Sequence, residues 1–279
     1  MKNHCIALFL CGGIGCITKR KLWEFVQGHS WEALLVELTK ADKVAILQQL
    51  RKITDWQTTT AYSEWLVGNP FITIEDPEYP PLLKEIADPP LVLFYAGHLA
   101  LLQQPALAVV GSRAAATSRR QLVGELITPL LKDYVIISGL ARGIDSFAHQ
   151  LTTSQQGQTI GIVGCGLDRC YPSENQRLFQ QMKEEQLIIS EYPKGTPPRQ
   201  YHFPQRNRLI AGLAQGVVVI EAKEKSGSLI TAQLALENGR EVFAVPGDPL
   251  QNNAEGCHSL IRDGAKCTTK MTHILEELS

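Results

Sequence analysis

Residues 107–145 read LAVVGSRAAATSRRQLVGELITPLLKDYVIISGLARGID and set the pattern for most of the chain. The runs Leu107–Val110 and Val135–Ser138 are short and continuously apolar, as in parallel strands that are covered on both faces. Between them, apolar residues recur at helical spacing over about 118–131. A strand, a helix and a second strand in this order predict a parallel β-α-β unit.

The same alternation continues on both sides of this unit. The predicted strands are Phe71–Ile74, Leu91–Tyr95, Leu107–Val110, Val135–Ser138, Thr159–Val163, Leu187–Ser190, Gly216–Ile220 and Glu241–Val245. The predicted helices lie at about 118–131, 145–154, 174–184, 205–214 and 228–238. We therefore expect an α/β fold, an extended Rossmann-like domain over residues 71–279 with a doubly wound, mostly parallel sheet.

Residues 1–68 show helical periodicity and predict a small N-terminal all-α domain. The expected helices are Cys5–Cys11, Ile17–Gln27, Trp31–Thr39, Lys43–Leu50 and about Asp55–Leu66. Gly12-Gly13-Ile14-Gly15 resembles the turn of a helix-hairpin-helix, whose backbone N–H groups could hold a DNA phosphate. An ordinary bundle turn, in which glycine supplies a positive φ, explains the same residues.

Charge is distributed unevenly along the chain. The net charge is −1, so the total does not indicate a strongly basic polyanion-binding protein. Residues 105–220, however, hold 12 Lys and Arg against 8 Asp and Glu, and Tyr192–Ile220 contains four bases and no carboxylate. A nearly neutral protein with this distribution can carry a basic groove.

The cysteines and the apolar segments indicate a cytoplasmic protein with no membrane association. Seven cysteines without a C-x-x-C pair fit neither a disulfide framework nor a structural zinc site, so we expect reduced thiols. The apolar run Cys5–Cys16 is shorter than the roughly 20 residues that span a bilayer. Lys19-Arg20-Lys21 follows it where a signal peptide would have its cleavage site.

Small residues and arginines follow four of the predicted strands, at the edge of the sheet where such folds bind ligands. The loops are Gly111-Ser112-Arg113, Gly139-Leu140-Ala141-Arg142-Gly143-Ile144-Asp145, Gly164-Cys165-Gly166 and Ser226-Gly227-Ser228. Amides near helix starts favour an anion, and glycine lets a phosphate approach the backbone. Glycines in strand-to-helix turns are common without any ligand, but four such loops with two arginines favour a phosphate-binding mouth. Asp145 is expected to be a helix N-terminal residue and not a catalytic acid.

The segment Arg199–Arg208, RQYHFPQRNR, adds three arginines with Tyr201, His202 and Phe203 interleaved. Arginines beside aromatic rings that stack on bases are typical of proteins that bind single-stranded nucleic acid. We expect Phe203 to be a core residue that seats the following helix. Arg206-Asn207-Arg208 is expected at the N-terminus of that helix, where a phosphate would sit.

Several catalytic and cofactor motifs are missing from the sequence. It has no G-x-x-x-x-G-K-[ST], no intact G-x-G-x-x-G and no G-x-S-x-G, and its histidines show no metal-ligand spacing. We therefore expect neither a P-loop motor, nor a dinucleotide cofactor, nor a metal site, nor an enzyme.

These residues closely resemble the DNA-processing protein A (DprA/Smf) family. The matching motifs run in the family's order over roughly 71–267. They are Tyr79-Pro80-Pro81-Leu82-Leu83 with Pro89-Pro90-Leu91, Gly111-Ser112-Arg113, Ser138–Asp145 with Ala148-His149, Gly166-Leu167-Asp168 with Tyr171-Pro172, Ser190-Glu191-Tyr192, Phe203-Pro204, Arg206-Asn207-Arg208 with Ile210–Leu213, Ser226–Thr231 and Pro246-Gly247.

The resemblance implies a protein that binds single-stranded DNA, forms a homodimer and loads RecA recombinase in natural transformation. It would protect incoming DNA and displace single-strand-binding protein. By motif match, the DNA-pocket residues are Gly111, Ser112, Arg113, Gly139, Arg142, Gly143, Arg206, Asn207 and Arg208, to which the loop pattern adds Arg199, Ser226, Gly227 and Ser228. Residues 1–68 are similar to the family's sterile-alpha-motif-like domain. Because the sequence stops at Ser279, we expect the winged-helix domain of many members to be missing.

Within the resemblance, the dimer interface is expected in the C-terminal part of the Rossmann domain. Leu260 and Ile261 are adjacent in a predicted helix at Gly256–Asp263, and neighbouring positions cannot both face one core stripe. One of them would face a partner, or else the helix is buried on both sides.

Two other functions stay open. One is a Rossmann-like nucleoside monophosphate hydrolase of the lysine-decarboxylase-like type, which uses a P-G-G-x-G-T-x-x-E loop. Lys225–Thr231 stands at the corresponding place without the double glycine and the acid. The other is a small-ligand or nucleotide-sensing module with no DNA role.

Overall fold

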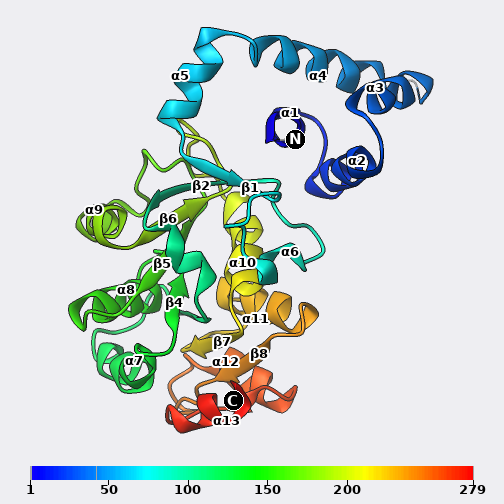
Figure 1. The fold of residues 1–279 in the computed structure, drawn as a ribbon. Coiled ribbons are helices and arrows are strands. Elements are labelled where there is room, and N and C mark those ends of the chain that lie inside the picture. The colour runs from blue at the N-terminus through cyan, green and yellow to red at the C-terminus, as the bar shows by residue number, and fades with distance from the viewer. Residues whose placement is uncertain (1, 42, 279) are drawn as a thin grey trace. The chain divides into compact units, whose positions relative to one another are not determined.

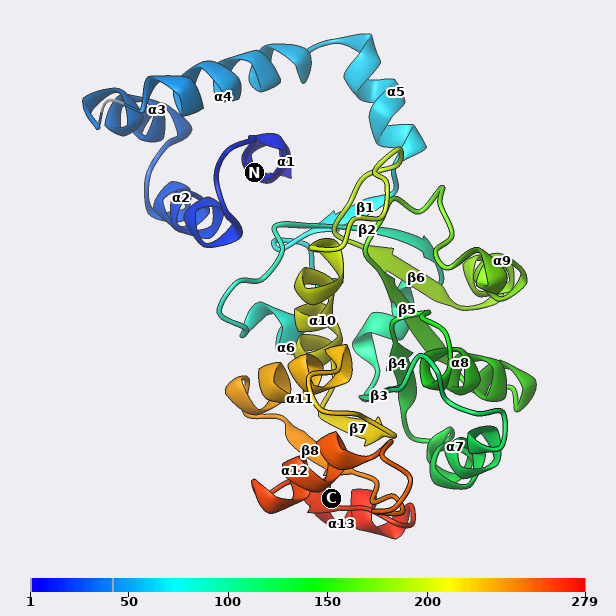
Figure 2. The same cartoon turned by 180° about the vertical axis from the view of Figure 1, so that it is seen from behind.

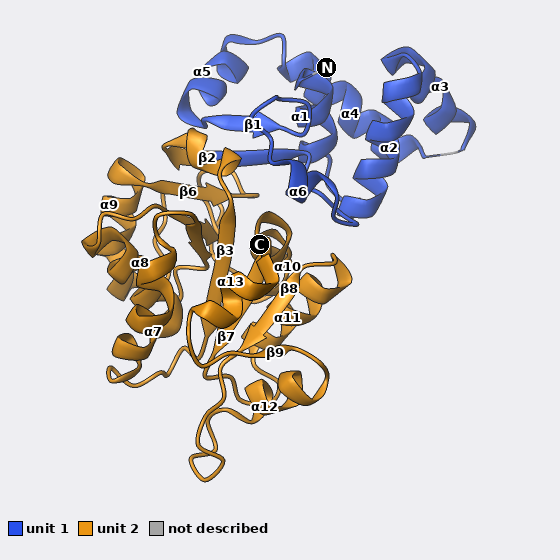
Figure 3. Ribbon diagram, turned by 60° about the horizontal axis from the view of Figure 1, so that its bottom comes forward, with its two compact units in different colours: residues 1–94 blue, residues 95–279 orange. Residues whose placement is uncertain are grey.

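The strand-and-helix alternation of the sequence forms a parallel sheet in residues 95–279. In the computed structural model, which describes residues 2–41 and 43–278, these residues are one of two compact units; the other comprises residues 1–94 (Figure 3). The strands of the larger unit are β3 (Ala106–Gly111), β4 (Val135–Ser138), β5 (Thr159–Val163), β6 (Leu187–Ser190), β7 (Gly216–Ile220), β8 (Glu241–Ala244) and β9 (Lys266–Cys267). Their order is β6-β5-β4-β3-β7-β8-β9, and each adjacent pair is parallel.

Helices cover both faces of this sheet (Figures 1 and 2). On one face lie α7 (Arg119–Ile127), α8 (Ile144–Ser154) and α9 (Gln176–Glu185), and on the other α10 (His202–Leu213) and α11 (Gly227–Glu237). The chain moves outward from β3 to β6 and then returns to β7 on the other side of β3. Because β-α-β crossovers are right-handed, this reversal places the later helices on the opposite face. The doubly wound, mostly parallel sheet is confirmed.

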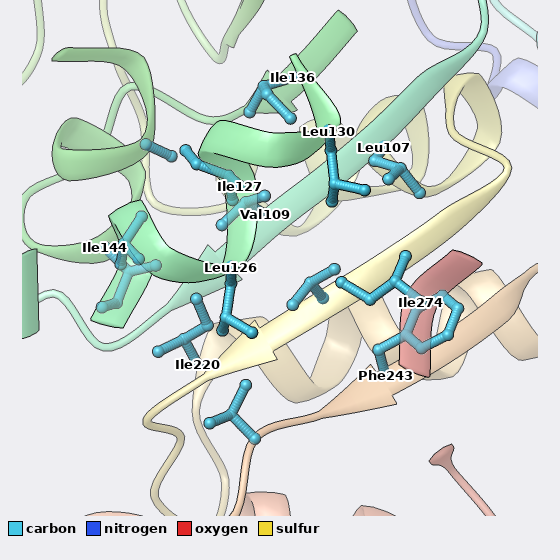
Figure 4. Packing of buried hydrophobic residues seen from close by; sticks show 14 residues of the cluster. Leu107, Val109, Leu126, Ile127, Leu130, Ile136, Ile144, Ile220, Phe243 and Ile274 are labelled. Carbon is cyan, nitrogen blue, oxygen red and sulfur yellow. The ribbon is translucent and has the colours of Figure 1, made fainter. Parts of the chain in front are cut away.

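The core on the α7 and α8 face joins residues from both halves of the sheet (Figure 4). Leu107 and Val109 of β3 pack in one cluster with Leu126 of α7 and Phe243 of β8. Ile274 of α13 (Thr272–Leu278) completes the same cluster, so the last helix is part of the domain core. The continuously apolar strands are therefore buried on both faces, as their composition predicts.

The smaller unit begins with helices. They are α1 (Lys2–Leu10), α2 (Cys16–Gly28), α3 (Trp31–Lys40), α4 (Val44–Trp56) and α5 (Thr60–Gly68). Strand β1 (Phe71–Thr73), the short helix α6 (Pro81–Lys84) and the first half of β2 (Val92–Gly97) follow, and β1 pairs with β2 in antiparallel register. The change from helices to strands falls between Gly68 and Phe71, where the two domains were predicted to meet, whereas the compact units divide after Phe94.

Several boundaries differ from those predicted. The helix predicted at Lys43–Leu50 continues to Trp56, and the helix predicted at about Asp55–Leu66 begins only at Thr60. It begins there because Thr59 Oγ1 accepts the Tyr62 N–H and caps α5. The sequence pattern did not indicate α6, β9, α13 or the short 3₁₀ turn η1 (Leu99–Gln103). The predicted helix at about 118–131 ends in the 3₁₀ turn η2 (Thr128–Leu130), and the one at about 174–184 begins in the 3₁₀ turn η3 (Ser173–Asn175). Helix α12 (Glu255–Arg262) forms where expected.

The Gly12–Gly15 turn has the geometry of an ordinary bundle turn. Gly13 has a φ of +76°, and the Gly12 N–H donates to Gln49 Oε1 at 2.9 Å. One of the amides expected to face a phosphate is therefore occupied by a side chain of α4. A phosphate at the remaining amides stays a prediction. Among the described residues, no helix is both long and apolar enough to cross a bilayer.

Gly111, at the end of β3, shows how tightly the strand ends are packed. A Cβ built on Gly111 would lie 1.9 Å from the carbonyl oxygen of Ile220 and 2.7 Å from Ile144 Cγ1. The missing side chain at this position therefore serves the packing of β3 against β7 and Ile144, and a DNA contact of Gly111 stays a prediction.

We predict that Gly111→Ala destabilises the protein by roughly 1–3 kcal/mol, because a backbone carbonyl has to move to admit the methyl group. Gly227→Ala is the matched control, since nothing lies within 4 Å of a Cβ there, and it should change stability by less than about 0.5 kcal/mol. Urea unfolding of both variants measures the difference. Equal stability of the two variants would contradict this packing.

Candidate functional site

A pocket of about 230 Å³ opens at the carboxyl ends of β3, β4 and β5. Four segments that are distant in sequence line it: the loop after β3, the loop after β4, the loop after β5 and the first turns of α10. The lining residues are Arg113, Ala114, Gly139, Ala141, Arg142, Tyr171, Pro172, Phe203 and Arg206. The pocket thus lies at the edge of the sheet where doubly wound folds place their ligands.

The charged side chains of this lining are all arginines. Arg113 and Arg142 are exposed at the opening, and Arg206 is buried. The lining contains no carboxylate, so its charge is positive. A guanidinium offers several N–H donors in a fixed planar arrangement that matches the oxygens of phosphate groups.

Two aromatic rings form the apolar part of the pocket. The ring centres of Tyr171 and Phe203 are 5.4 Å apart, and the Arg113 guanidinium carbon lies 5.5 Å from the Phe203 centre. Tyr171 is 50% exposed and Phe203 is half-buried. The expectation that Phe203 belongs to the core is therefore wrong. Its position at the start of α10 turns the ring toward the loops above the sheet.

Arg142 is already paired with a carboxylate. Its Nη2 donates to Glu174 Oε1, and both side chains are more than half exposed, at 61% and 56%. A hydrogen bond from its own backbone, and after it the pairing with Arg142, hold the pKa of Glu174 below its usual value, so its carboxylate is ionised at neutral pH. The Glu174 carboxylate thus accepts from Arg142 a charge-assisted hydrogen bond of the kind that a phosphate oxygen would accept.

Arg206 forms the floor of the pocket. Its side chain is only 4% exposed, and Nη1 donates to the carbonyl oxygen of Ile162 in β5 at 2.7 Å. A Cβ on Gly139 would lie 1.7 Å from the same Nη1, so glycine is needed there to admit the guanidinium. Burial lowers the pKa of Arg206 to about 10, which leaves it protonated at neutral pH.

Asp145 is the buried counter-charge of Arg206. Burial raises the pKa of the Asp145 carboxyl, and the Arg206 charge and two amide donors oppose this rise. The donors are the N–H groups of Gly139, at 3.1 Å, and Ala141, at 3.4 Å. Asp145 is thus confirmed as a residue in the first turn of α8. The same contacts correct the expectation that the Gly139 N–H is available to a phosphate, because that N–H donates to Asp145 Oδ2.

Asn207 and Arg208 lie elsewhere than predicted. Helix α10 begins at His202, so Arg206-Asn207-Arg208 falls within the helix and not at its N-terminus. Arg208 is 7% exposed, and its Nη2 contacts both carboxylate oxygens of Glu191, at 2.7 and 2.6 Å. Asn207 Nδ2 donates to the Gly227 carbonyl oxygen at 3.1 Å, which ties α10 to the start of α11. Neither residue lines the pocket.

The remaining predicted residues support the loops or lie outside the pocket. Gly143 has a φ of +69°, and a Cβ there would lie 2.2 Å from the Ser112 carbonyl oxygen. The same oxygen accepts the Ile144 N–H at 3.2 Å, so Ser112 and Gly143 join the β3 and β4 loops beneath the pocket. The others, outside the pocket lining, are Arg199, Ser226, Gly227 and Ser228.

Of the residues predicted to bind DNA, the structure therefore brings together Arg113, Gly139, Arg142 and Arg206. Sequence reasoning did not assign Ala114, Ala141, Tyr171 and Pro172 to the pocket, and it placed Phe203 in the core. An aromatic residue in a loop after an apolar strand, as at Tyr171, is the one signal in the sequence that could have indicated this wall.

The predicted dimer interface stays a prediction. Leu260 and Ile261 lie side by side on α12, and both are half-buried, so neither is fully covered by this chain.

The fold and the pocket define a Rossmann-like α/β protein with a positively charged site at the carboxyl edge of its sheet. The sequence matches the family model of DNA recombination-mediator protein A over residues 70–279, and the chain belongs to that family.

Relatives in this family are similar over most of the chain. The DNA processing protein DprA of Streptococcus pneumoniae is 48% identical over 208 residues, which are 75% of this chain and 74% of that protein. The X-ray structure of S. pneumoniae DprA aligns with a TM-score of 0.90 and 40% identity, covering 99% of this chain and 97% of that one. A structure of DNA processing protein A from Helicobacter pylori, described for its single-stranded DNA binding mode, aligns with a TM-score of 0.67 and 31% identity, covering 75% and 95%.

We predict that Arg206→Met lowers the free energy of unfolding by about 3 kcal/mol at pH 8, because it leaves Asp145 buried without its counter-charge. Removing the cation raises the pKa of Asp145 further. A raised carboxyl pKa favours the folded state at low pH, and this contribution is lost as pH rises through the folded-state pKa. The deficit should therefore be smaller at pH 5 than at pH 8.

Urea unfolding at the two pH values measures this effect. Arg199→Met, which changes an exposed arginine of the neighbouring segment, should cost less than about 0.5 kcal/mol at either pH. A deficit of the same size at pH 5 and pH 8 would show that Arg206 contributes through packing alone.

Proposed function

We propose that this protein binds single-stranded DNA in the arginine-lined pocket and catalyses no reaction on it. The observation that carries the proposal is the combination of Arg113 and Arg142 at the opening with Tyr171 and Phe203 in one wall. The arginines suit the phosphates, and the rings suit the faces of unpaired bases.

The shape of the pocket favours a part of a long ligand over a whole small one. About 230 Å³ is less than the roughly 300–1,000 Å³ of a typical small-molecule pocket. The Tyr171 ring, which lines the pocket, is 50% exposed, so a DNA strand that enters the pocket can continue past this ring into solvent. Bases in a duplex are stacked on each other, so only an unpaired base offers its face to these rings.

The relatives support the same function. Several are named as DNA processing proteins, and the H. pylori structure is described for single-stranded DNA binding. By this kinship we further propose a role in natural transformation, in which the protein forms a homodimer, protects incoming DNA, displaces single-strand-binding protein and loads RecA in the cytoplasm. Reconstituted RecA filament formation on strands coated with single-strand-binding protein tests this role.

The absence of catalysis is supported by the composition of the pocket. Among the described residues that line it, there is no serine, cysteine, histidine or carboxylate to act as nucleophile or general base. Asp145 and His149 lie close in sequence but are buried, and burial lowers the pKa of His149 to about 3. Incubation with AMP tests the rival hydrolase function, and release of adenine that depends on Arg113 would contradict our proposal.

We predict that Arg113→Ala weakens binding of oligo-dT and of a mixed-sequence strand by the same factor, about 10- to 100-fold. One charge-assisted hydrogen bond contributes about 1.5–3 kcal/mol, and a phosphate contact carries no sequence information. The dependence of log affinity on log salt should also fall by roughly 0.7.

Fluorescence anisotropy at several salt concentrations measures both quantities. Lys132→Ala is the matched control, because Lys132 is exposed in the loop that enters β4 at the opposite edge of the sheet. It should bind like the unchanged protein. A folded Arg113→Ala variant with unchanged affinity and salt dependence would refute the pocket as the DNA site.

A second prediction concerns the pairing of Arg142 with Glu174. If a phosphate takes the place of the carboxylate, Glu174→Gln frees Arg142 in advance and should strengthen binding about 2- to 5-fold, in line with the modest energy of exposed ion pairs. Glu185→Gln, an exposed change at the end of α9, serves as the control. Weaker binding by Glu174→Gln would contradict the competition.

A further inference from the structure

A second cluster of aromatic rings, outside the pocket, lies at the start of α10. Its members are Tyr192, Tyr201 and His202, together with the guanidinium of Arg199. The Tyr192 and His202 rings stack at 4.0 Å between centres, and the Tyr201 ring meets the His202 ring edge-on at 4.6 Å. None of these residues lines the pocket, so the cluster needs its own explanation.

His202 fixes the cluster on the sheet. The ring is buried, and Nδ1 lies 2.8 Å from the Gly164 carbonyl oxygen, directly after β5. Burial is the main cause that lowers the pKa of His202, so the ring is neutral at physiological pH. Tyr192 is held as well, because its hydroxyl donates to Gln205 Oε1 at 2.8 Å. The Tyr192 and His202 rings therefore form a rigid, uncharged support for Tyr201.

Tyr201 is the member that faces outward. It is 54% exposed, although its hydroxyl is held by Arg199 Nη1 at 2.9 Å. The Arg199 guanidinium carbon lies 5.9 Å from the centre of the same ring. An exposed ring that is fixed at its edge by His202 and at its hydroxyl by an arginine is ordered before any ligand arrives, which lowers the entropy cost of binding.

The two sites lie along the same edge of the sheet. The pocket occupies the carboxyl ends of β3, β4 and β5, whereas Gly164 follows β5 and Tyr192 follows β6. The cluster therefore begins at the last strand of the pocket and extends to β6, the next strand of the sheet, about 4.8 Å away. His202 and Phe203 are also adjacent in the chain, and they turn to the two different sites. From Tyr192 to Tyr201 the sequence has no carboxylate that would repel a phosphate.

We infer that Tyr201 and Arg199 form a second nucleotide subsite, in which the Tyr201 ring stacks on a base and Arg199 contacts the phosphate beside it. The inference rests on the proposed function, because it extends the path of the same strand. The DNA would then run along the carboxyl edge of the sheet from β3 toward β6, with one base at Phe203 and a neighbouring one at Tyr201.

The test combines protein variants with strands that lack single bases. Fluorescence anisotropy would follow an oligo-dT strand, just long enough to bind fully, in which an abasic site replaces one base at a time. With the unchanged protein, we expect abasic sites at two separate positions to weaken binding about tenfold each, within the range that one stacked base contributes.

Tyr201→Ala should weaken binding of the intact strand about tenfold and abolish the effect of one abasic position only. Loss of coupling at that single position distinguishes a stacking contact from a general change of structure. Tyr201→Phe is the matched control: it keeps the ring and loses only the hydroxyl contact with Arg199, so it should keep both sensitive positions and lose much less affinity than Tyr201→Ala. Arg199→Ala should lower the salt dependence by roughly 0.7.

The outcomes separate this inference from the proposed function. If Phe203→Ala weakens binding, but Tyr201→Ala keeps full affinity and both sensitive positions, the second subsite is refuted. The pocket then remains supported as the DNA site. If neither Arg113→Ala nor Phe203→Ala weakens binding, the proposed function itself fails. If Tyr201→Ala leaves DNA binding intact and impairs only assembly with a protein partner, the cluster is a protein contact and the inference is overturned.

Discussion

The buried Arg206 guanidinium is the interaction on which the site depends. It lies under Gly139, donates to Ile162 of β5 and is balanced by Asp145 at the start of α8. A buried cation is costly unless its charge and donors are satisfied, so the β4 loop, β5 and α10 must keep fixed relative positions. The walls of the pocket are built on these three elements and on the loop after β3. Arg206, which the sequence indicated as a DNA-binding residue, thus holds the loops of the pocket in place.

The four arginines that the family motifs contain therefore divide into two groups. Arg206 and Arg208 are buried and bound to groups of the protein, whereas Arg113 and Arg142 are exposed at the opening. Arg113 and Arg142 can turn to a ligand without leaving a buried carboxylate alone. Glu174 already balances one of them, which moderates the positive charge of the opening when no phosphate is present.

The topology explains why the site takes this form. The chain reverses direction across β3, and helices then cover opposite faces of the sheet, so loops from both halves meet at one edge. Arg119 and Glu221 form an ion pair at 2.6 Å close to the end of β7, and the space there is only about 10 Å³. The open volume is instead on the β4 and β5 side, where α10 contributes Phe203. Aromatic rings beside exposed arginines follow that edge toward β6.

Strands β3 to β8, the helices between them and the edge of the sheet that carries the pocket could be predicted from the amino-acid sequence, whereas β9 and α13 could not. Apolar runs such as Val135–Ser138 and Gly216–Ile220 are strands in the structure with those bounds, because their composition suits only a sheet covered on both faces. Arg113 and Arg142 were predicted as site residues because they lie in strand-to-helix loops, and both line the pocket. The burial of Arg206 and Arg208, and the position of Phe203 beside Tyr171 in one wall of the pocket, depend on the assembled fold. Those outcomes depend on which side of α10 packs against β5 and on contacts between residues more than 30 positions apart, such as Tyr171 with Phe203. Local propensity and spacing contain no information about such contacts, because burial and pairing are set by the assembled sheet.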